Sequence, residues 1–176
     1  SMFQRLLVGL DGSAGADAAL DAALMLGRRA GATIVLAAVT EIRLLEAPIF
    51  EAAGPLWTEG MPLAPVASEI REVLDARAKR FLAEGSDRVA EAGLAVETVR
   101  AVGIVDEELL RLAETTDAVV IGRRGELQTH PGKIGAVTSH IIKSALRPVL
   151  VAGDHPSAFE RPVVAFDGGE TSGHAL

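Results

Sequence analysis

The fold is decided by the stretch "VVIGRRGELQTHPGKIGAVTSHIIKSALRPVLVAG", residues 119–153. Within it, Gly122, Gly125 and Gly135 follow the spacing G-x2-G-x9-G between a strand-like run and a helix-like run. Glycine permits positive φ angles and lets another group approach the main chain closely. Glycines ahead of a helix start commonly form an anion cradle, because the first N–H groups of the helix point at the ligand. The pattern therefore predicts a phosphate-binding loop.

Strand-like and helix-like segments alternate outward from this loop. We expect strands at 4–11, 32–39, 94–103, 117–122 and 147–153, and helices at 14–31, 67–93, 104–116 and 136–146. This alternation predicts right-handed βαβ crossovers and a parallel sheet. Ser68 is the expected N-cap of the second helix, Gly31 is the expected end of the first, and Pro148 favours an edge position for the last strand.

The composition narrows the class of protein. Of 176 residues, 49% are hydrophobic but only 3% are aromatic, so Ala, Val, Leu and Ile must build the core, as in parallel sheets covered on both faces. The net charge of -7 argues against nonspecific binding to nucleic acid or to an anionic membrane. The absence of cysteine excludes disulfides and thiolate metal sites. There is no long apolar run, and the N-terminal segment turns too early for a signal peptide, so we expect a cytoplasmic protein.

Two segments depart from the alternating pattern. Residues 41–65 are rich in proline and glycine, with Trp57 among them, which indicates a long loop that is either a functional lid or a surface excursion. The segment "FERPVVAFDGGETSGHAL", 159–176, matches "FQRLLVGLDGSAGADAAL", 3–20, at several positions in register. We therefore predict one domain at 1–153, followed at 154–176 by a linker and the first strand of a truncated second repeat.

The topology predicts where a ligand binds. Open doubly wound sheets bind ligands at the carboxyl ends of the strands, where the strand order reverses. This brings Asp11, after the first strand, close to Gly122 and Gly125, after the fourth. Gly135 then precedes a helix whose dipole favours a phosphate.

With "LLVGLDGS", "ATIVLAAVT", "GRRGELQTHPGKIGAVT" and "RPVLVA", the chain resembles the universal stress protein family over nearly all of residues 2–153. The resemblance implies an adenine-nucleotide α-hydrolase-like fold, an open doubly wound α/β sheet of five parallel strands in the order 3-2-1-4-5. It also implies a homodimer through the edge strand from Pro148 to Val151, and ATP, with or without Mg2+, as the ligand.

The resemblance assigns residues to that ligand. Asp11 would contact the ribose, the backbone at Val39 would contact adenine, and the glycine loop and the helix start would hold the phosphates, with Thr138 adding a hydroxyl. Ala136 departs from the family pattern, which has Ser or Thr there, and the loss of one hydrogen bond weakens binding by about 1 kcal/mol. The expected nucleotide-binding residues are Leu10, Asp11, Val39, Ile121, Gly122, Arg123, Gly125, Gly135, Ala136, Val137 and Thr138.

Some of these residues have simpler explanations that the sequence leaves open. Asp11 in "DGS" is also a common turn residue or helix cap, and glycines also occur as plain loop residues. Arg123, Arg124 and Lys133 are either solvated or turned toward phosphates. His130 and His140 lack a second ligand at metal spacing, so we expect no metal site.

The expected function is that of an ATP-binding regulatory protein of the stress response. The alternatives are a dimeric scaffold that has lost nucleotide binding, which Ala136 favours, and a slow ATPase. There is no GxxxxGK loop and no GxGxxG fingerprint, and no catalytic residues are assigned, so efficient catalysis is not expected.

Overall fold

The computed structural model describes residues 3–43, 45, 63–125 and 134–153. Several predicted features, namely Trp57, His130, Lys133 and the segment 154–176, lie outside the described residues.

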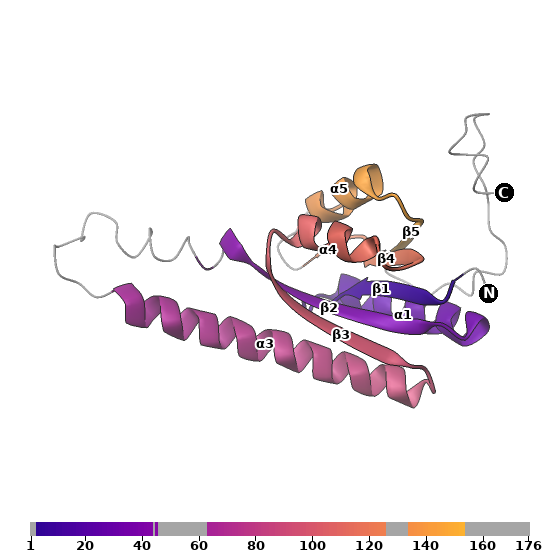
Figure 1. The fold of residues 1–176 in the computed structure, drawn as a ribbon, viewed down its shortest axis with the longest axis horizontal. Coiled ribbons are helices and arrows are strands. Elements are labelled where there is room, and N and C mark those ends of the chain that lie inside the picture. Colours follow the sequence, from indigo (N-terminus) through magenta and orange to yellow (C-terminus); the bar gives the residue numbers. More distant parts are fainter. Residues whose placement is uncertain (1–2, 44, 46–62, 126–133, 154–176) are drawn as a thin grey trace.

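A twisted parallel sheet forms the middle layer of the molecule (Figure 1). Its strands are β1 (Arg5–Gly9), β2 (Thr33–Glu41), β3 (Val96–Gly103), β4 (Ala118–Gly122) and β5 (Val149–Ala152). They are arranged in the order β3-β2-β1-β4-β5, and every neighbouring pair is parallel. The predicted fold class and strand order are therefore confirmed, and the order reverses between β1 and β4.

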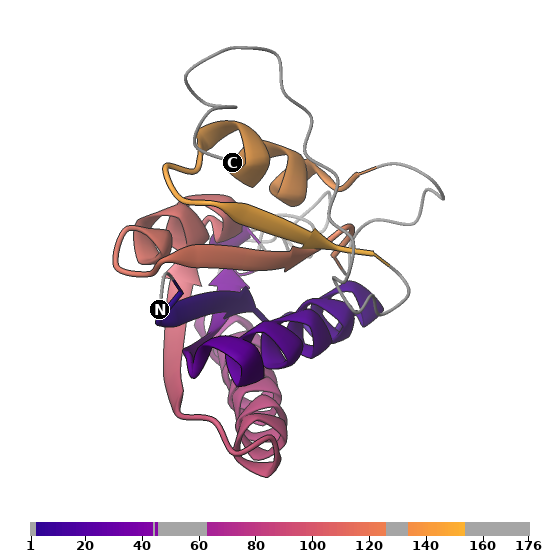
Figure 2. The same cartoon turned by 90° about the vertical axis from the view of Figure 1, so that its right-hand side faces the viewer.

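Helices cover both faces of the sheet (Figures 1 and 2). α1 (Ala14–Ala30) and α3 (Leu63–Glu91) pack on one face, and α4 (Val105–Ala113) and α5 (Ala136–Ser144) pack on the other. The two core clusters follow this division: Leu6 and Val8 of β1 face α1 and α3, whereas Leu7 faces the opposite layer. The alternation follows from the two-residue period of a strand.

The ends of α1 show why the helix forms where it does. Ser13 is the N-cap, and its Oγ accepts a hydrogen bond of 3.1 Å from the N–H of Ala16. Gly31 ends the helix in the left-handed conformation with φ of 68°, as predicted, and its N–H donates to the carbonyl of Gly27.

The predicted boundaries are wrong at the end of β2 and at the start of α3. β2 continues to Glu41 because its last residues still pair with β3, up to Glu41 opposite Gly103. α3 begins at Leu63, so Ser68 lies inside the helix and is not its N-cap. Pro65 lies in the first turn of α3, where the missing N–H of proline removes no helical hydrogen bond. The proline-rich segment that predicted a loop up to residue 65 therefore includes the first residues of this helix.

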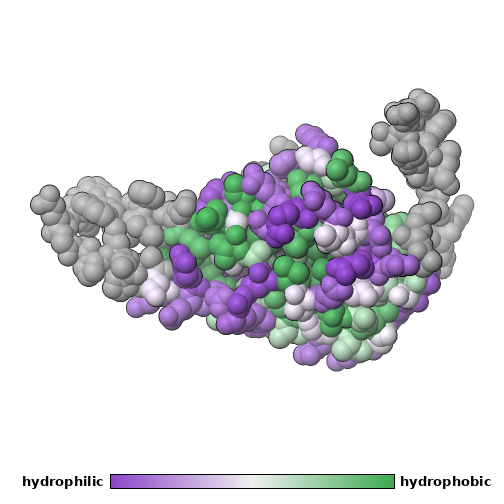
Figure 3. Space-filling view, viewed as in Figure 1, coloured by the Kyte–Doolittle hydropathy of each residue, from purple (hydrophilic) through white to green (hydrophobic). Residues whose placement is uncertain are grey.

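The face seen in Figure 3 mixes hydrophobic and hydrophilic residues without one broad apolar area. Among the described helices, none combines the length and the apolar character that crossing a membrane requires.

Candidate functional site

A pocket of about 520 Å³ lies at the carboxyl ends of β1, β2 and β4, next to the point where the strand order reverses. Residues from both helical layers line it together with the strand ends. The lining residues are Gly9, Leu10, Asp11, Ser13, Ala16, Ala37, Ala38, Val39, Thr40, Glu41, Arg43, Leu74, Arg77, Ala78, Phe81, Val105, Leu109, Ile121, Gly122, Arg124, Gly125, Gly135, Ala136, Val137 and Thr138. The topological rule thus places a pocket where the sequence predicted a ligand.

All the predicted nucleotide-binding residues except Arg123 line this pocket, and Arg124 lines it instead. The backbone of Arg123 continues the pairing of β4 with β5, because its N–H donates to the carbonyl of Ala152 at 3.2 Å. Its own carbonyl accepts from the N–H of Gly135 at 2.9 Å. Arg123 lies in this strand extension, outside the pocket lining, and its contact with a nucleotide stays a prediction.

Asp11 combines its predicted position at the pocket with the simpler role of a turn residue. Its Oδ1 accepts a hydrogen bond of 2.9 Å from the N–H of Ser13, two residues on, which is an Asx turn. The helix cap is Ser13, not Asp11. Asp11 also lies against the glycine loop, since a Cβ on Gly125 would come within 2.8 Å of Asp11 Oδ2.

Gly122 is needed for the close approach of another backbone segment and not for a positive φ angle. Among the described glycines, positive φ angles occur at Gly12, Gly31 and Gly93. By contrast, a Cβ on Gly122 would come within 2.3 Å of the carbonyl oxygen of Gly15, a backbone atom that cannot move aside. Backbone thus packs against backbone between the first turn of α1 and the end of β4.

The N-terminus of α5 opens into the pocket without a side-chain cap. Its N-cap is Gly135, with φ of -63° and ψ of 154°, and no side chain there bonds the first turn. The N–H groups of Ala136, Val137 and Thr138 have no carbonyl one turn earlier in the helix. In α1 the corresponding end is closed by Ser13, so α5 is the better anion acceptor of the two.

Thr138 is engaged inside the protein. Its Oγ1 donates a hydrogen bond of 2.8 Å to the carbonyl of Gly122, and its side chain is buried. This hydrogen bond joins the helix start to the end of β4, and a phosphate contact by the same hydroxyl stays a prediction. The backbone N–H of Thr138 remains at the pocket.

The sequence did not predict that residues of α3 line the pocket. Leu74, Arg77, Ala78 and Phe81 line the pocket at i, i+3, i+4 and i+7, one face of the helix. The apolar periodicity of residues 67–93 did reveal that face. It did not reveal how far along the sheet the helix extends, and therefore which residues overhang the pocket.

An ion pair lies at the carboxyl end of β2, at the edge of the pocket. Glu41 binds Arg43 through both carboxylate oxygens, at 2.8 Å each, and also accepts from the N–H of Val105 at 3.4 Å. The hydrogen bonds from Arg43 hold the pKa of Glu41 below its ordinary value, against a raising effect of burial. The carboxylate of Glu41 is thus already engaged by protein groups.

His140 pairs with Asp106, which joins α5 to α4. Burial alone would raise the pKa of Asp106, but the hydrogen bonds from His140 and from the backbone outweigh it, so the pKa is lowered. No group of three or more His, Cys, Asp or Glu side chains suited to a metal occurs within the described ranges.

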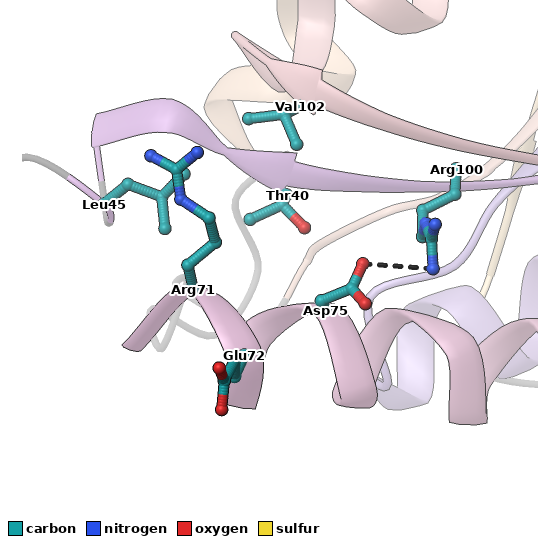
Figure 4. A pocket seen from close by; sticks show the side chains of 7 residues that line it. All are labelled: Thr40, Leu45, Arg71, Glu72, Asp75, Arg100 and Val102. Atoms are coloured by element: carbon teal, nitrogen blue, oxygen red, sulfur yellow. Dashed lines mark ion pairs between the residues drawn. The ribbon is translucent and has the colours of Figure 1, made fainter. Parts of the chain in front are cut away.

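A second, smaller pocket of about 300 Å³ lies between α3 and the far ends of β2 and β3 (Figure 4). Arg100 of β3 pairs there with Asp75 of α3 at 3.1 Å, and Thr40 and Val102 line the strand side. The pair is partly exposed, and Asp75 also binds Lys79 at 2.9 Å. This arrangement is a surface ion-pair network that ties α3 to the edge strand.

Comparison with known proteins identifies the family. The model of the universal stress protein family matches residues 2–153. The chain belongs to the universal stress protein family.

Individual relatives agree with this assignment. The universal stress protein YxiE of Bacillus subtilis is 27% identical over 154 residues, which cover 85% of this chain and 99% of the relative. The universal stress protein MJ0577 of Methanocaldococcus jannaschii is 29% identical over 86 residues, which span about half of each chain, 48% and 53%. The solved structure of MJ0577 has a TM-score of 0.72, at 23% identity, over 89% of this chain and 100% of that one. A universal stress protein solved in complex with cAMP has a TM-score of 0.58, at 23% identity, over 88% of this chain and 100% of that one.

Proposed function

We propose that this protein binds an adenine nucleotide, ATP in the first place, at the pocket on the carboxyl edge of the sheet. In this proposal it acts as a cytoplasmic regulatory protein of the stress response. The observation that carries the proposal is the convergence of Asp11, Val39 and the three loop glycines on one pocket into which the uncapped start of α5 opens. A family member bound to cAMP adds support from a relative.

The arrangement suits the three parts of a nucleotide. The backbone at Val39 can meet the adenine, with the apolar side chains of Val105 and Leu109 also lining the pocket. Asp11 would accept hydrogen bonds from ribose hydroxyls. The phosphates would lie against the glycine loop and the first N–H groups of α5, with Mg2+ arriving on the phosphates.

We expect binding without efficient hydrolysis. The carboxylates that line the pocket are Asp11 and Glu41. Asp11 already accepts from the N–H of Ser13, and Glu41 is bound by Arg43 and the N–H of Val105. A hydrolase needs a group that positions and deprotonates water, and neither carboxylate is placed for that work.

The decisive test is calorimetric titration of nucleotide-free protein with ATP and Mg2+, using the Gly135→Asp variant. Gly135 has N-cap backbone angles, which suit an aspartate, so the variant should stay folded and cap α5 with its own carboxylate. That carboxylate would occupy the N–H groups and repel phosphate, and ATP affinity should fall at least about tenfold.

The matched control is Gly135→Asn, which caps the helix without a charge and should weaken ATP binding less than aspartate does. If Gly135→Asp binds ATP as tightly as the wild-type protein does, the phosphates do not bind at the start of α5. If the wild-type protein gives no heat and no thermal stabilisation at millimolar ATP, the nucleotide proposal fails and the scaffold function, favoured by Ala136, replaces it.

We also propose that the chain forms a homodimer through the edge strand from Pro148 to Val151. The carbonyls of Pro148 and Ala152 accept from Val119 and Arg123 on β4, so by alternation the backbone groups of Val149 and Val151 face the open side of β5. Unpaired strand edges favour pairing with another chain.

Val151→Pro tests this interface. Proline removes an N–H from the open side while leaving the bonds to β4 in place, and edge strands tolerate it there. We expect a dimer for the wild-type protein and a monomer for the variant in light scattering after size exclusion. A wild-type monomer, or a variant that dimerises as strongly as the wild type, would rule out this edge as the interface.

A further inference from the structure

The pocket has a basic residue on the side that the glycine pattern does not include. Arg77 projects from the α3 face that also carries Leu74, Ala78 and Phe81. α3 and α5 cover opposite faces of the sheet (Figure 1). Since Arg77 belongs to α3, it and the start of α5 line the pocket from opposite sides.

Phe81 fixes this part of α3 against the turn after β1. The turn residue Gly12 has φ of 78°, and a Cβ there would come within 2.4 Å of the Phe81 ring. The ring therefore packs directly on the backbone between Asp11 and Ser13. Any movement of α3 relative to this turn would disturb the contact.

Contacts with Phe81 and with the backbone of Asp11 orient the guanidinium of Arg77. Its Cζ lies 5.2 Å from the centroid of the Phe81 ring, a cation–π distance. Its Nη2 donates a hydrogen bond of 3.3 Å to the carbonyl oxygen of Asp11. A guanidinium carries a permanent positive charge and five N–H donors, and its planar fork suits phosphate oxygens.

The charges around the pocket favour an anion between these walls. The pocket is lined by the carboxylates of Asp11 and Glu41 and by the guanidinium groups of Arg43, Arg77 and Arg124, so among the described residues positive side chains outnumber negative ones by three to two. The turn at residues 11–13 and the glycine loop are in contact, as the approach of Gly125 to Asp11 shows. Arg77 hydrogen-bonds this turn and therefore lies at the same end of the pocket as the glycine loop.

We propose that Arg77 is a nucleotide-binding residue that contacts the phosphate groups of the ligand from the α3 side, opposite the N–H groups of α5. This inference rests on the proposed nucleotide binding at the same pocket. It makes affinity depend on phosphate charge through a side chain outside the glycine loop, so the pocket selects phosphorylated ligands over the bare nucleoside.

The experiment compares ATP and adenosine binding to the wild-type protein, Arg77→Met and Arg80→Met by calorimetric titration. Arg80 is the matched control, because it lies 5.4 Å from the same Phe81 ring but pairs with Glu84 at 3.8 Å and does not line the pocket. Losing a charge-assisted hydrogen bond should weaken ATP binding by Arg77→Met about tenfold or more, and adenosine binding by less than about threefold. Arg80→Met should bind both ligands as the wild type does.

Equal losses for ATP and adenosine in Arg77→Met would overturn the inference, since Arg77 would then act on the turn and not on phosphate. Unchanged ATP affinity would overturn it as well. Arg77→Lys, which keeps the charge but not the planar fork, guards against misfolding of the methionine variant. The ATP affinity of Arg77→Lys should lie between that of the wild-type protein and that of Arg77→Met, and its adenosine affinity should equal that of the wild type. An equal loss of affinity for both ligands would again contradict a phosphate contact. If the wild-type protein binds neither ligand, the proposed function itself fails. If the wild-type protein binds ATP and Arg77→Met binds it equally well, only the role of Arg77 fails.

Discussion

At the scale of single residues, Gly15 and Gly122 meet where the first turn of α1 crosses the end of β4. A Cβ on Gly15 would lie 2.0 Å from the carbonyl oxygen of Arg124, and one on Gly122 would lie 2.3 Å from the carbonyl oxygen of Gly15. Both clashes involve backbone atoms, so no rotamer change relieves them. The absence of a side chain at Gly15 and at Gly122 therefore allows the two backbone segments to pack directly on each other.

Gly15→Ala should destabilise the protein by about 1–3 kcal/mol, the usual cost of overpacking, and should displace the loop at Arg124. Gly27→Ala in the same helix is the control, because its Cβ would meet only side-chain tips, Leu94 Cδ1 at 2.9 Å and Ile34 Cδ1 at 3.1 Å, at close range. Urea unfolding of the two variants measures the difference. A Gly15→Ala variant as stable as Gly27→Ala would show that the contact relaxes at little cost.

Single side chains were the hardest feature to predict. The sequence correctly suggested Asp11 as a turn residue, because the Asx turn is a local interaction. It did not distinguish Arg123 from Arg124, since both follow β4 and only their place in the pairing with β5 separates them. Nor could it show that the Thr138 hydroxyl donates to Gly122, a contact between residues sixteen positions apart.

At the scale of elements, Asp117 holds the starts of β1 and β4 together. Its Oδ2 accepts hydrogen bonds from the N–H groups of Gln4 at 2.7 Å and Arg5 at 2.8 Å. Its own N–H donates to the carbonyl of Arg5 at 2.9 Å. The bonds from Gln4 and Arg5 lower the pKa of Asp117 below its ordinary value.

This lowered pKa predicts a pH dependence of stability. The carboxylate stabilises the folded state fully above its unfolded pKa of about 3.9, and the contribution is lost as pH falls through the lower folded pKa. Asp117→Asn should therefore be less stable than the wild type at neutral pH, with the gap closing near the acid end. Urea unfolding at neutral pH and at about pH 3 measures it, with Asp87→Asn, an exposed position on α3, as the control. A gap that stays constant with pH, or that also appears in the control, would contradict the role of Asp117.

The elements themselves were largely predictable, because each strand is a short apolar run and each helix has a clear apolar face. The errors fell where tertiary pairing overrides local signals. β2 extends to Glu41 through its register with β3, and α3 starts before the proline that suggested a loop.

At the scale of the whole molecule, the family resemblance predicted the strand order, and the place of the pocket follows from that order. Alternating elements imply the parallel sheet, and the reversal between β1 and β4 opens the edge at which Asp11 and the glycine loop meet. The contribution of α3 could not be predicted in the same way. It depends on the packing of Phe81 against Gly12, a contact between distant segments that no local pattern encodes.

The contact between Gly15 and Gly122 also affects how loss of function is recognised among relatives. A glycine required by packing is maintained by selection for folding, so Gly122 should persist in family members that have stopped binding nucleotide. Gly125 is different, because among the described residues an added Cβ there would meet only a side-chain atom, Oδ2 of Asp11, within 4 Å. Once binding is no longer selected, Asp11 and Gly125 are free to drift together while Gly122 stays. Paired changes at these two positions, and not the bare glycine count, should separate lapsed members of the family from active ones.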